Sequence, residues 1–277
     1  MSPLVGRGEG PGQFRPAGGL AVSSTNEIFV ADEHNKRIQV FSMKGGFLRS
    51  FPTGNMKPQA VCMGNNDTLW VASYPRRASD YGHAIQQYSK EGSVLAKFKC
   101  NDTRLCSIAW HKFSGRIILS LKKLSARAHL STAWLSPTYT QTEATPWLTC
   151  DMTGFGSKGS KFVVPQFVTV DKNGNIFIAD SIKNHVEKYD KNGVYLSSFG
   201  SKGTGAGNLY NPSGICVDSL GRVIVADTGN SRVEMFTAEG EHIRTIAYIN
   251  QPTHVATGGE GQLVLTHGKF VTILPKY

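Results

Sequence analysis

The chain of 277 residues is 40% hydrophobic and 18% charged, with 30 glycines and 12 prolines. That apolar share excludes intrinsic disorder as the main state, and no apolar run is long enough for a transmembrane helix. Five cysteines argue against a disulfide scaffold and indicate a reducing compartment. With no visible leader, we expect a cytoplasmic protein that does not associate with a membrane.

The charge is strongly basic, with a formal net charge of +10 and an isoelectric point near 9.4. Such a balance favours polyanionic partners such as nucleic acid, acidic proteins or anionic membranes. The alternative is that the charge serves solubility alone.

A short apolar phrase that ends in Asp, Ser or Thr recurs along the chain. Ten or eleven residues before each ending lies a small side chain within another apolar run. The copies follow one another at intervals of about 40 to 60 residues, which is typical of the blades of a β-propeller. The runs are rich in Val, Ile and Phe and are bounded by Gly, Asn and Asp, so they predict strands. The small residues are Ala21, Cys62, Ala109, Thr169, Cys216 and Ala256, and the matching endings are Asp32, Ser73, Ser120, Asp180, Asp227 and Thr266.

The fifth copy gives the plan of one blade. We predict four strands, here named a to d from the propeller axis outward, over 214–218, 222–227, 232–236 and 242–246. A small residue on strand a fits the crowded axis. The carboxylate that ends strand b can accept backbone N–H bonds in the next loop, so these Asp residues are interpreted as structural.

The last copy supplies only three strands, over 253–258, 262–266 and 270–274. Residues 4–8 resemble the end of the outer strand of the fourth copy, so we expect them to complete the last blade. The prediction is therefore an all-β, six-bladed propeller forming a single domain over 1–277, itself monomeric. Its third blade is degenerate, with an insertion around 121–150 and strands expected near 128–135 and 147–152.

Several copies share a longer pattern that resembles the NHL repeat. In the first copy it reads Gly12-Gln13-Phe14-Arg15-Pro16, then Ile28 to Asp32, then Asn35-Lys36-Arg37-Ile38-Gln39-Val40-Phe41. The fifth copy repeats it over 207–214 and 230–236, and the fourth in part. The whole chain resembles the C-terminal NHL propeller of TRIM-NHL proteins.

That resemblance implies two functions for the domain. NHL propellers of this group bind single-stranded or hairpin RNA on one face, which would serve post-transcriptional regulation, or they recruit protein partners for a TRIM-type ubiquitin ligase. The RING-type ligase chemistry would belong to other parts of such a protein, because the Cys and His residues here lack RING zinc spacing. We expect RNA binding, with protein recruitment as the alternative.

The expected RNA-binding residues lie on the d-to-a and b-to-c connections, which share one face. Cations, exposed rings and amides are the groups that phosphates and unstacked bases need, and Glu91, Glu239, Glu241 and Glu260 are expected on the opposite face. Asn35, Asn184 and Asn230 have an alternative interpretation as turn caps. The candidates are Arg15, His34, Asn35, Lys36, Lys57, Tyr74, Arg76, Arg77, Arg104, Lys161, Lys183, Asn184, Tyr210, Asn211, Asn230 and His267.

Neighbouring residues have structural interpretations. Phe14 and Leu209 are expected to be buried loop anchors, whereas Tyr210 should point outward. Arg37 and Arg232 are expected to pair with neighbouring carboxylates. We expect no enzyme activity, cofactor or metal, because no Walker loop, GxSxG or HExxH motif occurs. The enzymatic alternative is a peptide-amidating lyase, which also has an NHL-like propeller and would need clustered His metal ligands.

Overall fold

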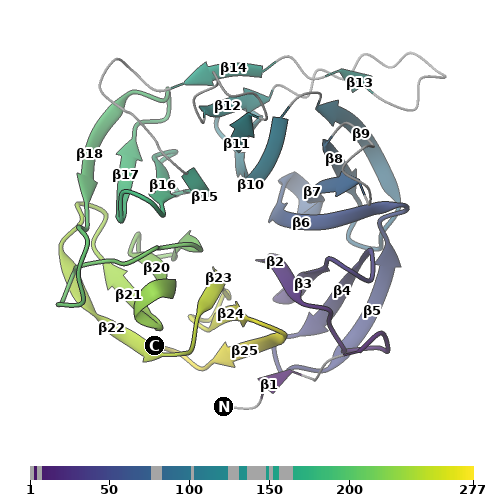
Figure 1. Cartoon of the computed structure of the whole chain (residues 1–277). Helices are drawn as coiled ribbons and strands as arrows, with labels where there is room; N and C mark the ends of the chain where they lie inside the picture. Colours follow the sequence, from purple (N-terminus) through teal and green to yellow (C-terminus); the bar gives the residue numbers. More distant parts are fainter. Residues whose placement is uncertain are drawn as a thin grey trace.

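The computed structural model describes residues 3–4, 8–75, 83–100, 103–123, 131–135, 148–149, 152–155 and 165–277, with side chains over 8–75, 83–100, 105–120 and 166–277. The strands form small sheets around a central axis (Figure 1), which confirms the predicted all-β propeller. Two short 3-10 helices, η1 (Asn65–Asp67) and η2 (Thr228–Asn230), lie in connections. Within the described residues, no helix has the length and apolar character needed to cross a membrane.

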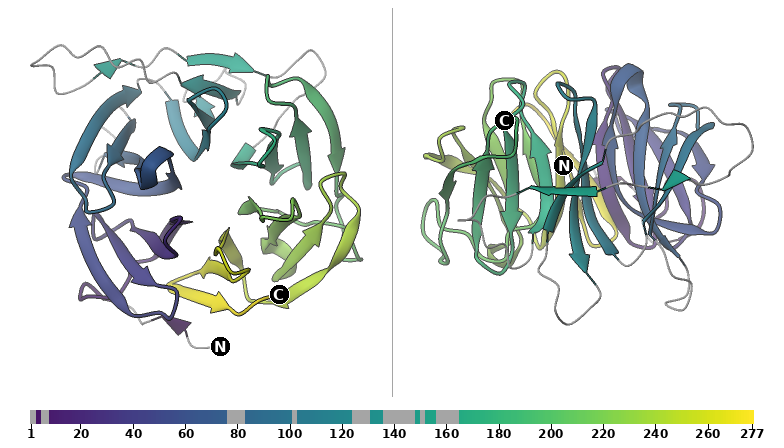
Figure 2. Two further views of the ribbon diagram at one scale, coloured as in Figure 1. Left: turned by 180° about the vertical axis from the view of Figure 1, so that it is seen from behind. Right: turned by 90° about the horizontal axis from the view of Figure 1, so that it is seen from above.

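Five sheets form clear blades of four antiparallel strands, and the short strand β13 is added to the edge of one of them. In four of them the chain runs from the innermost strand to the outermost one, and the outer strands form the rim of the disc seen from the side in Figure 2. The first is β2 (Ala17–Val22), β3 (Glu27–Asp32), β4 (Arg37–Ser42) and β5 (Phe47–Pro52); the second is β6 (Met56–Met63), β7 (Leu69–Pro75), β8 (His83–Tyr88) and β9 (Val94–Cys100). Next come β15 (Pro165–Val170), β16 (Ile176–Asp180), β17 (His185–Tyr189) and β18 (Tyr195–Phe199), then β19 (Ile215–Val217), β20 (Val223–Asp227), β21 (Arg232–Phe236) and β22 (His242–Tyr248).

The last blade combines strands from two distant parts of the sequence. It contains β23 (Pro252–Thr257), β24 (Leu263–His267) and β25 (Phe270–Leu274), and its outer strand is β1 (Pro3–Leu4). Pro3 pairs with Thr272 and Leu4 with Val271, as the missing strand of the last repeat predicts.

A further sheet lies between the second and fourth repeats, where the degenerate third repeat is expected. It consists of β10 (Thr103–His111), β11 (Arg116–Lys123), β12 (Ser131–Leu135) and β14 (Met152–Phe155). The strand expected over 147–152 is instead divided between two sheets, because β13 (Leu148–Thr149) pairs parallel with β9 while β14 pairs with β12. Backbone groups at the edge of the second blade thereby gain partners, which an outer strand otherwise lacks.

The axis is lined by the small residues that the repeat pattern singles out. All six of them contact one cavity of about 330 Å³, which the inner strands β2, β6, β10, β15, β19 and β23 surround. Burial raises the pKa of the Cys62 and Cys216 thiols, so both stay neutral there. The axis is therefore an open space lined by small, uncharged side chains.

Apolar side chains pack between each sheet and its neighbour. Phe29 and Val40 of the first blade meet Leu69 and Tyr88 of the second, and equivalent clusters follow around the ring. Val264 and Val271 of the last blade pack with Phe14 and Phe41 of the first. The ring is therefore closed by a hydrophobic cluster as well as by the pairing of β1.

Candidate nucleic-acid interface

Among the described residues, one side of the disc carries the connections that lead into an inner strand or join the second strand of a blade to its third. We call this side the loop face; it comprises the described segments 8–16, 33–36, 53–55, 181–184, 200–214, 228–231, 249–251 and 268–269 together with the strand ends that adjoin them. The opposite side carries the short turns between first and second and between third and fourth strands, and we call it the turn face.

Buried ion pairs hold the loops of the loop face in place. Arg37 Nε lies 2.8 Å from Asp32 Oδ2, and Arg232 Nε lies 2.9 Å from Asp227 Oδ2, with both carboxylates fully buried. The prediction that these arginines pair with carboxylates is thus confirmed. Each arginine also donates to the preceding outer-to-inner loop; Arg232 reaches the carbonyls of residues 204, 205 and 208. The buried pairs thereby fix the backbone position of the loops that cover them.

The three predicted asparagines also hold the loops together. Asn35 donates to the Gly8 carbonyl over 3.0 Å, and Asn230 donates to the Gly203 carbonyl over 2.8 Å. Both amides also donate to the buried Asp of their own blade. Asn184 donates to the Ile182 carbonyl and accepts from the backbone N–H of Asn211. The structure gives these amides an internal role, in line with the turn-cap interpretation.

Aromatic side chains on this face separate into buried anchors and exposed rings. Phe14 and Leu209 are fully buried, as predicted, whereas Tyr210 is 45% exposed. Lys202 Nζ lies 5.6 Å from the centroid of the Tyr210 ring, so a cation and an exposed ring stand together. Tyr248 is more exposed still, at 77%, and pairs in register with Arg232. Sequence reasoning missed Tyr248 because it lies two residues beyond the predicted outer strand.

A second group lies between the first and second blades. Lys57 Nζ is 5.5 Å from the centroid of the Tyr74 ring, and the Tyr74 hydroxyl donates to Glu33. His34 Nδ1 lies 3.7 Å from the same carboxylate. The structure therefore brings His34, Lys57 and Tyr74 together, with one acidic group among them.

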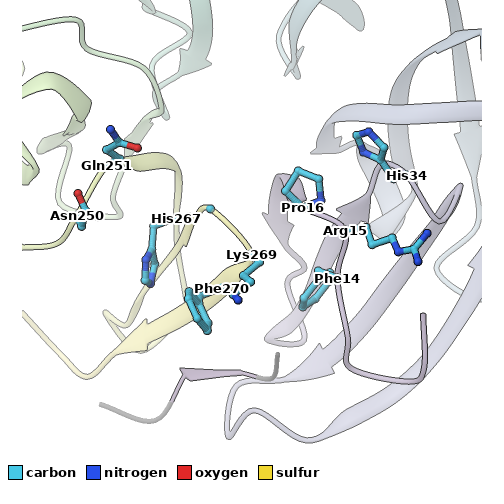
Figure 3. Close-up of a pocket in the computed structure, with 10 residues that line it drawn as sticks. Phe14, Arg15, Pro16, His34, Asn250, Gln251, His267, Lys269 and Phe270 are labelled. Atoms are coloured by element: carbon cyan, nitrogen blue, oxygen red, sulfur yellow. The ribbon is translucent and has the colours of Figure 1, made fainter. Parts of the chain in front are cut away.

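A cavity of about 810 Å³ opens where the first and last blades meet (Figure 3). It brings together Arg15, His34 and His267 from the predicted set. His267 Nε2 lies 2.9 Å from Thr272 Oγ1, and partial burial lowers the pKa of its imidazole. The complete lining is Phe14, Arg15, Pro16, His34, Asn250, Gln251, His267, Gly268, Lys269 and Phe270.

Asn250, Gln251 and Phe270 of this lining were absent from the sequence prediction. Phe270 lies opposite His267 at the register position where Arg37 and Arg232 lie opposite an aspartate, so the last copy departs from the shared pattern there. Only the closing of the ring places these three residues beside residues 14–16, so no local signal could identify them.

The two faces differ in acidic rather than in basic residues. Lys36, Lys57, Lys202 and Lys269 of the loop face form no ion pair within the described residues, while Arg15 pairs with the exposed Glu9. The acids of the described loop-face segments are the exposed Glu9 and the partly buried Glu33. The turn face carries both signs: Lys44, Lys90, Lys112, Arg116, Lys172, Lys191, Arg222 and Lys276 stand among Asp67, Glu91, Asp171, Asp190, Asp218, Glu239, Glu241 and Glu260.

The remaining candidates have less to contribute or lie outside the description. Lys183 Nζ pairs with the buried Glu187 over 3.3 Å, so its charge is partly neutralised. Asn211 is exposed in a left-handed turn. Arg76, Arg77 and Lys161 lie outside the described residues, as does the side chain of Arg104. Among the described side chains, no three His, Cys, Asp or Glu residues gather as metal ligands would.

Fold, repeat pattern and site together define the chain as an NHL-repeat β-propeller. The NHL repeat pattern matches residues 14–41 and 209–236, which are the two copies with the buried Asp–Arg pairs.

Over 95 residues the chain is 34% identical to the protein brain tumor of Drosophila melanogaster, a match that covers 31% of this chain and 9% of that protein.

Solved structures of low sequence identity share the fold. A protein of unknown function from Bacteroides thetaiotaomicron superimposes with a TM-score of 0.71 at 13% identity, covering 98% of this chain and 74% of that one. A gluconolactonase from Xanthomonas campestris gives 0.68 at 14% identity, covering 95% and 86%. Virginiamycin B lyase from Staphylococcus aureus gives 0.60 at 13% identity, covering 94% and 84%. At these identities the likeness concerns the fold alone.

Proposed function

We propose that the domain binds single-stranded or hairpin RNA on its loop face. The observation that carries this proposal is the pairing of uncompensated cations with exposed rings, above all Lys202 beside Tyr210. Single-stranded nucleic acid is held by cations along its backbone and by aromatic rings on which unstacked bases lie. The loop-face lysines supply the first, and Tyr210 and Tyr248 supply the second.

The turn face lacks the uncompensated charge. Its cations alternate with carboxylates, which would repel a phosphate chain at close range. The loop face is therefore the side on which a polyanion gains the most. The lysines of the described loop face supply this charge, and Arg76, Arg77, Arg104 and Lys161, whose side chains lie outside the described residues, would only add to it.

A Lys–aromatic pair on each face allows a matched experiment. Lys112 Nζ lies 5.5 Å from the centroid of the exposed Phe113 ring on the turn face. Fluorescence polarisation with short U-rich and hairpin RNAs, at two salt concentrations, would compare Lys202→Ala/Tyr210→Ala with Lys112→Ala/Phe113→Ala. We expect at least a tenfold loss only for the first double variant, and binding that weakens steeply with salt. Equal losses, or no binding at low salt, would contradict the proposal.

The alternative function is a platform that recruits proteins, in keeping with a TRIM-type ubiquitin ligase parent. Ile182 favours it, because this apolar side chain is 58% exposed on the loop face, and exposed apolar groups mark protein contacts. An Ile182→Ser variant that retains RNA affinity but loses a co-purifying protein would assign that contact to protein.

We extend the proposal to the blade number, the mode of action and the cellular setting of the domain. The sheet of β10, β11, β12 and β14 counts as the sixth blade of a closed ring. The domain acts by binding rather than by catalysis, and any ligase chemistry belongs to other parts of a parent protein. It works as a monomer in the cytoplasm.

A further inference from the structure

The cavity at the junction of the first and last blades has the composition of a ligand site. Its volume of about 810 Å³ is within the range of small-molecule pockets. Two connections of the first blade line it with residues 14–16 and His34, and two connections of the last blade line it with residues 250–251 and 267–270. All of them belong to the loop face, so the cavity is accessible from the proposed RNA-binding side.

The lining offers three kinds of group and no carboxylate among the described residues. The Phe270 ring and the His267 imidazole have centroids 5.4 Å apart and are tilted by 33°, and together they form an aromatic wall. The amides of Asn250 and Gln251 are exposed. Lys269 lies over the Phe270 ring at 5.5 Å and forms no ion pair within the described residues.

From this composition we propose that the cavity holds the terminal nucleotide of an RNA chain, with its phosphomonoester at Lys269 and Arg15. The inference rests on the proposed RNA-binding function. The base would stack on the Phe270–His267 wall and meet the Asn250 and Gln251 amides with its polar edge. The two cations match a terminal phosphate, which carries close to two negative charges at neutral pH, better than an internal phosphodiester, which carries one.

Arg15 forms an ion pair with Glu9. Its guanidinium Nη1 lies 2.8 Å from Glu9 Oε1, and Figure 3 shows the side chain directed away from His267 and Lys269. Both partners of this pair are more than half exposed, so the pair is weak and easily exchanged. A phosphate entering the cavity can replace the carboxylate and take the bidentate guanidinium contact.

The direct test measures mononucleotides and matched RNA ends. Titration of the protein with UMP, uridine and inorganic phosphate, followed by NMR or calorimetry, separates base from phosphate. Competition with one RNA sequence bearing a 5′-phosphate, a 3′-phosphate or hydroxyl ends shows which terminus is held. We expect UMP to bind at least tenfold more tightly than uridine or phosphate, and one phosphorylated end to improve RNA affinity about tenfold.

Variants locate the effect. Lys269→Ala and Arg15→Ala change exposed loop-face cations, so they should weaken hydroxyl-ended RNA as well, but they should weaken the end-phosphorylated RNA about tenfold more and so remove the gain from the terminal phosphate. Lys44→Ala, on the turn face, should change neither. Glu9→Gln should strengthen UMP binding, because it frees Arg15.

The outcomes separate this inference from the RNA-binding proposal. RNA binding that depends on Tyr210 but is indifferent to terminal phosphate and to Lys269 would overturn the inference alone. UMP binding that Lys269→Ala abolishes, without affinity for longer RNA, would retain the nucleotide pocket and overturn the proposed function. Phosphoserine or inorganic phosphate binding as tightly as UMP would overturn the assignment to a nucleotide.

Discussion

Arg232 and Asp227 lie opposite each other on β21 and β20, with Nε 2.9 Å from Oδ2, and the arginine connects this buried carboxylate to the loop of residues 204–208. The same relationship joins Arg37 to Asp32 in the first blade. A pair buried beneath a loop supports that loop, so its loss should affect stability and the loop face together.

Arg232→Ala should destabilise the domain by about 3–5 kcal/mol, because it leaves the buried Asp227 carboxylate without its partner. The urea midpoint measures this loss. Arg15→Ala is the matched control: its pair with Glu9 is exposed, and it should cost no more than about 1 kcal/mol. Similar losses for both variants would show that burial of the pair has no structural importance here.

His254 should make stability depend on pH. The partly buried imidazole packs edge-on against Phe167 and lies 3.0 Å from Thr266 Oγ1, and desolvation lowers its pKa to about 4. Between its ordinary pKa of 6.5 and about 4, the unfolded chain takes up a proton that the folded protein does not. This contribution therefore makes stability fall as pH drops from 6.5 to 4, by about 2 kcal/mol between pH 7 and 5.

Urea unfolding of the parent protein and of His254→Gln at pH 7 and pH 5 checks this expectation. The variant should lose about 2 kcal/mol of the difference between the two pH values, even if it is less stable at both. A pH dependence that survives the substitution unchanged would assign it to other groups.

Gly229→Ala should displace Tyr210 while leaving the tyrosine itself unmutated. A Cβ at Gly229 would lie 2.4 Å from Tyr210 Cδ1 and 2.5 Å from the Tyr210 carbonyl oxygen, so the tyrosine must move. We expect a stability loss of about 1–3 kcal/mol from this overpacking and a loss of RNA affinity like that of Tyr210→Ala. Gly46→Ala is the control, since its nearest neighbour would be the Ser42 hydroxyl at 3.3 Å on the turn face. RNA affinity that survives in Gly229→Ala would remove Tyr210 from the interface.

Glu33→Gln should strengthen RNA binding. The carboxylate stands beside Lys57, Tyr74 and His34 on the loop face, where it repels phosphates. Removing one charge near a phosphate is worth about 1 kcal/mol in water, or roughly fivefold in affinity at low salt, with little effect at high salt. Glu91→Gln removes an exposed charge from the turn face and should not change affinity. Weaker binding by Glu33→Gln would show that this carboxylate contributes a contact instead.

The parts of the structure that sequence predicted are those repeated in every copy. Ala21, Cys62 and Ala109 line the axis because each inner strand meets the same crowding there. Asp32 and Asp227 are buried beside an arginine because residues five apart on a hairpin become register partners. A repeated spacing thus carries geometric information, and the physical constraint behind it recurs in every blade.

The parts that sequence did not predict depend on contacts formed once. Gln251 and Phe270 come beside Arg15 only where the last blade meets the first. β13 pairs with a strand about 50 residues earlier, a choice that no local pattern encodes. In the sequence, Asn35 and Asn230 fit either a turn cap or a contact with an RNA base. The structure shows that their amides donate to the Gly8 and Gly203 carbonyls.

The hydrophobic cluster of Phe14, Phe41, Val264 and Val271 lies beside the same junction that opens into the cavity. Within the described residues, Pro3 and Leu4 of β1 pair with β25 there, so this junction is where the two ends of the chain meet to close the ring. A ligand bound between Arg15 and Lys269 would contact the first and the last blade at once. Binding of a ligand in the cavity should therefore also make the ring harder to open between its first and last blades.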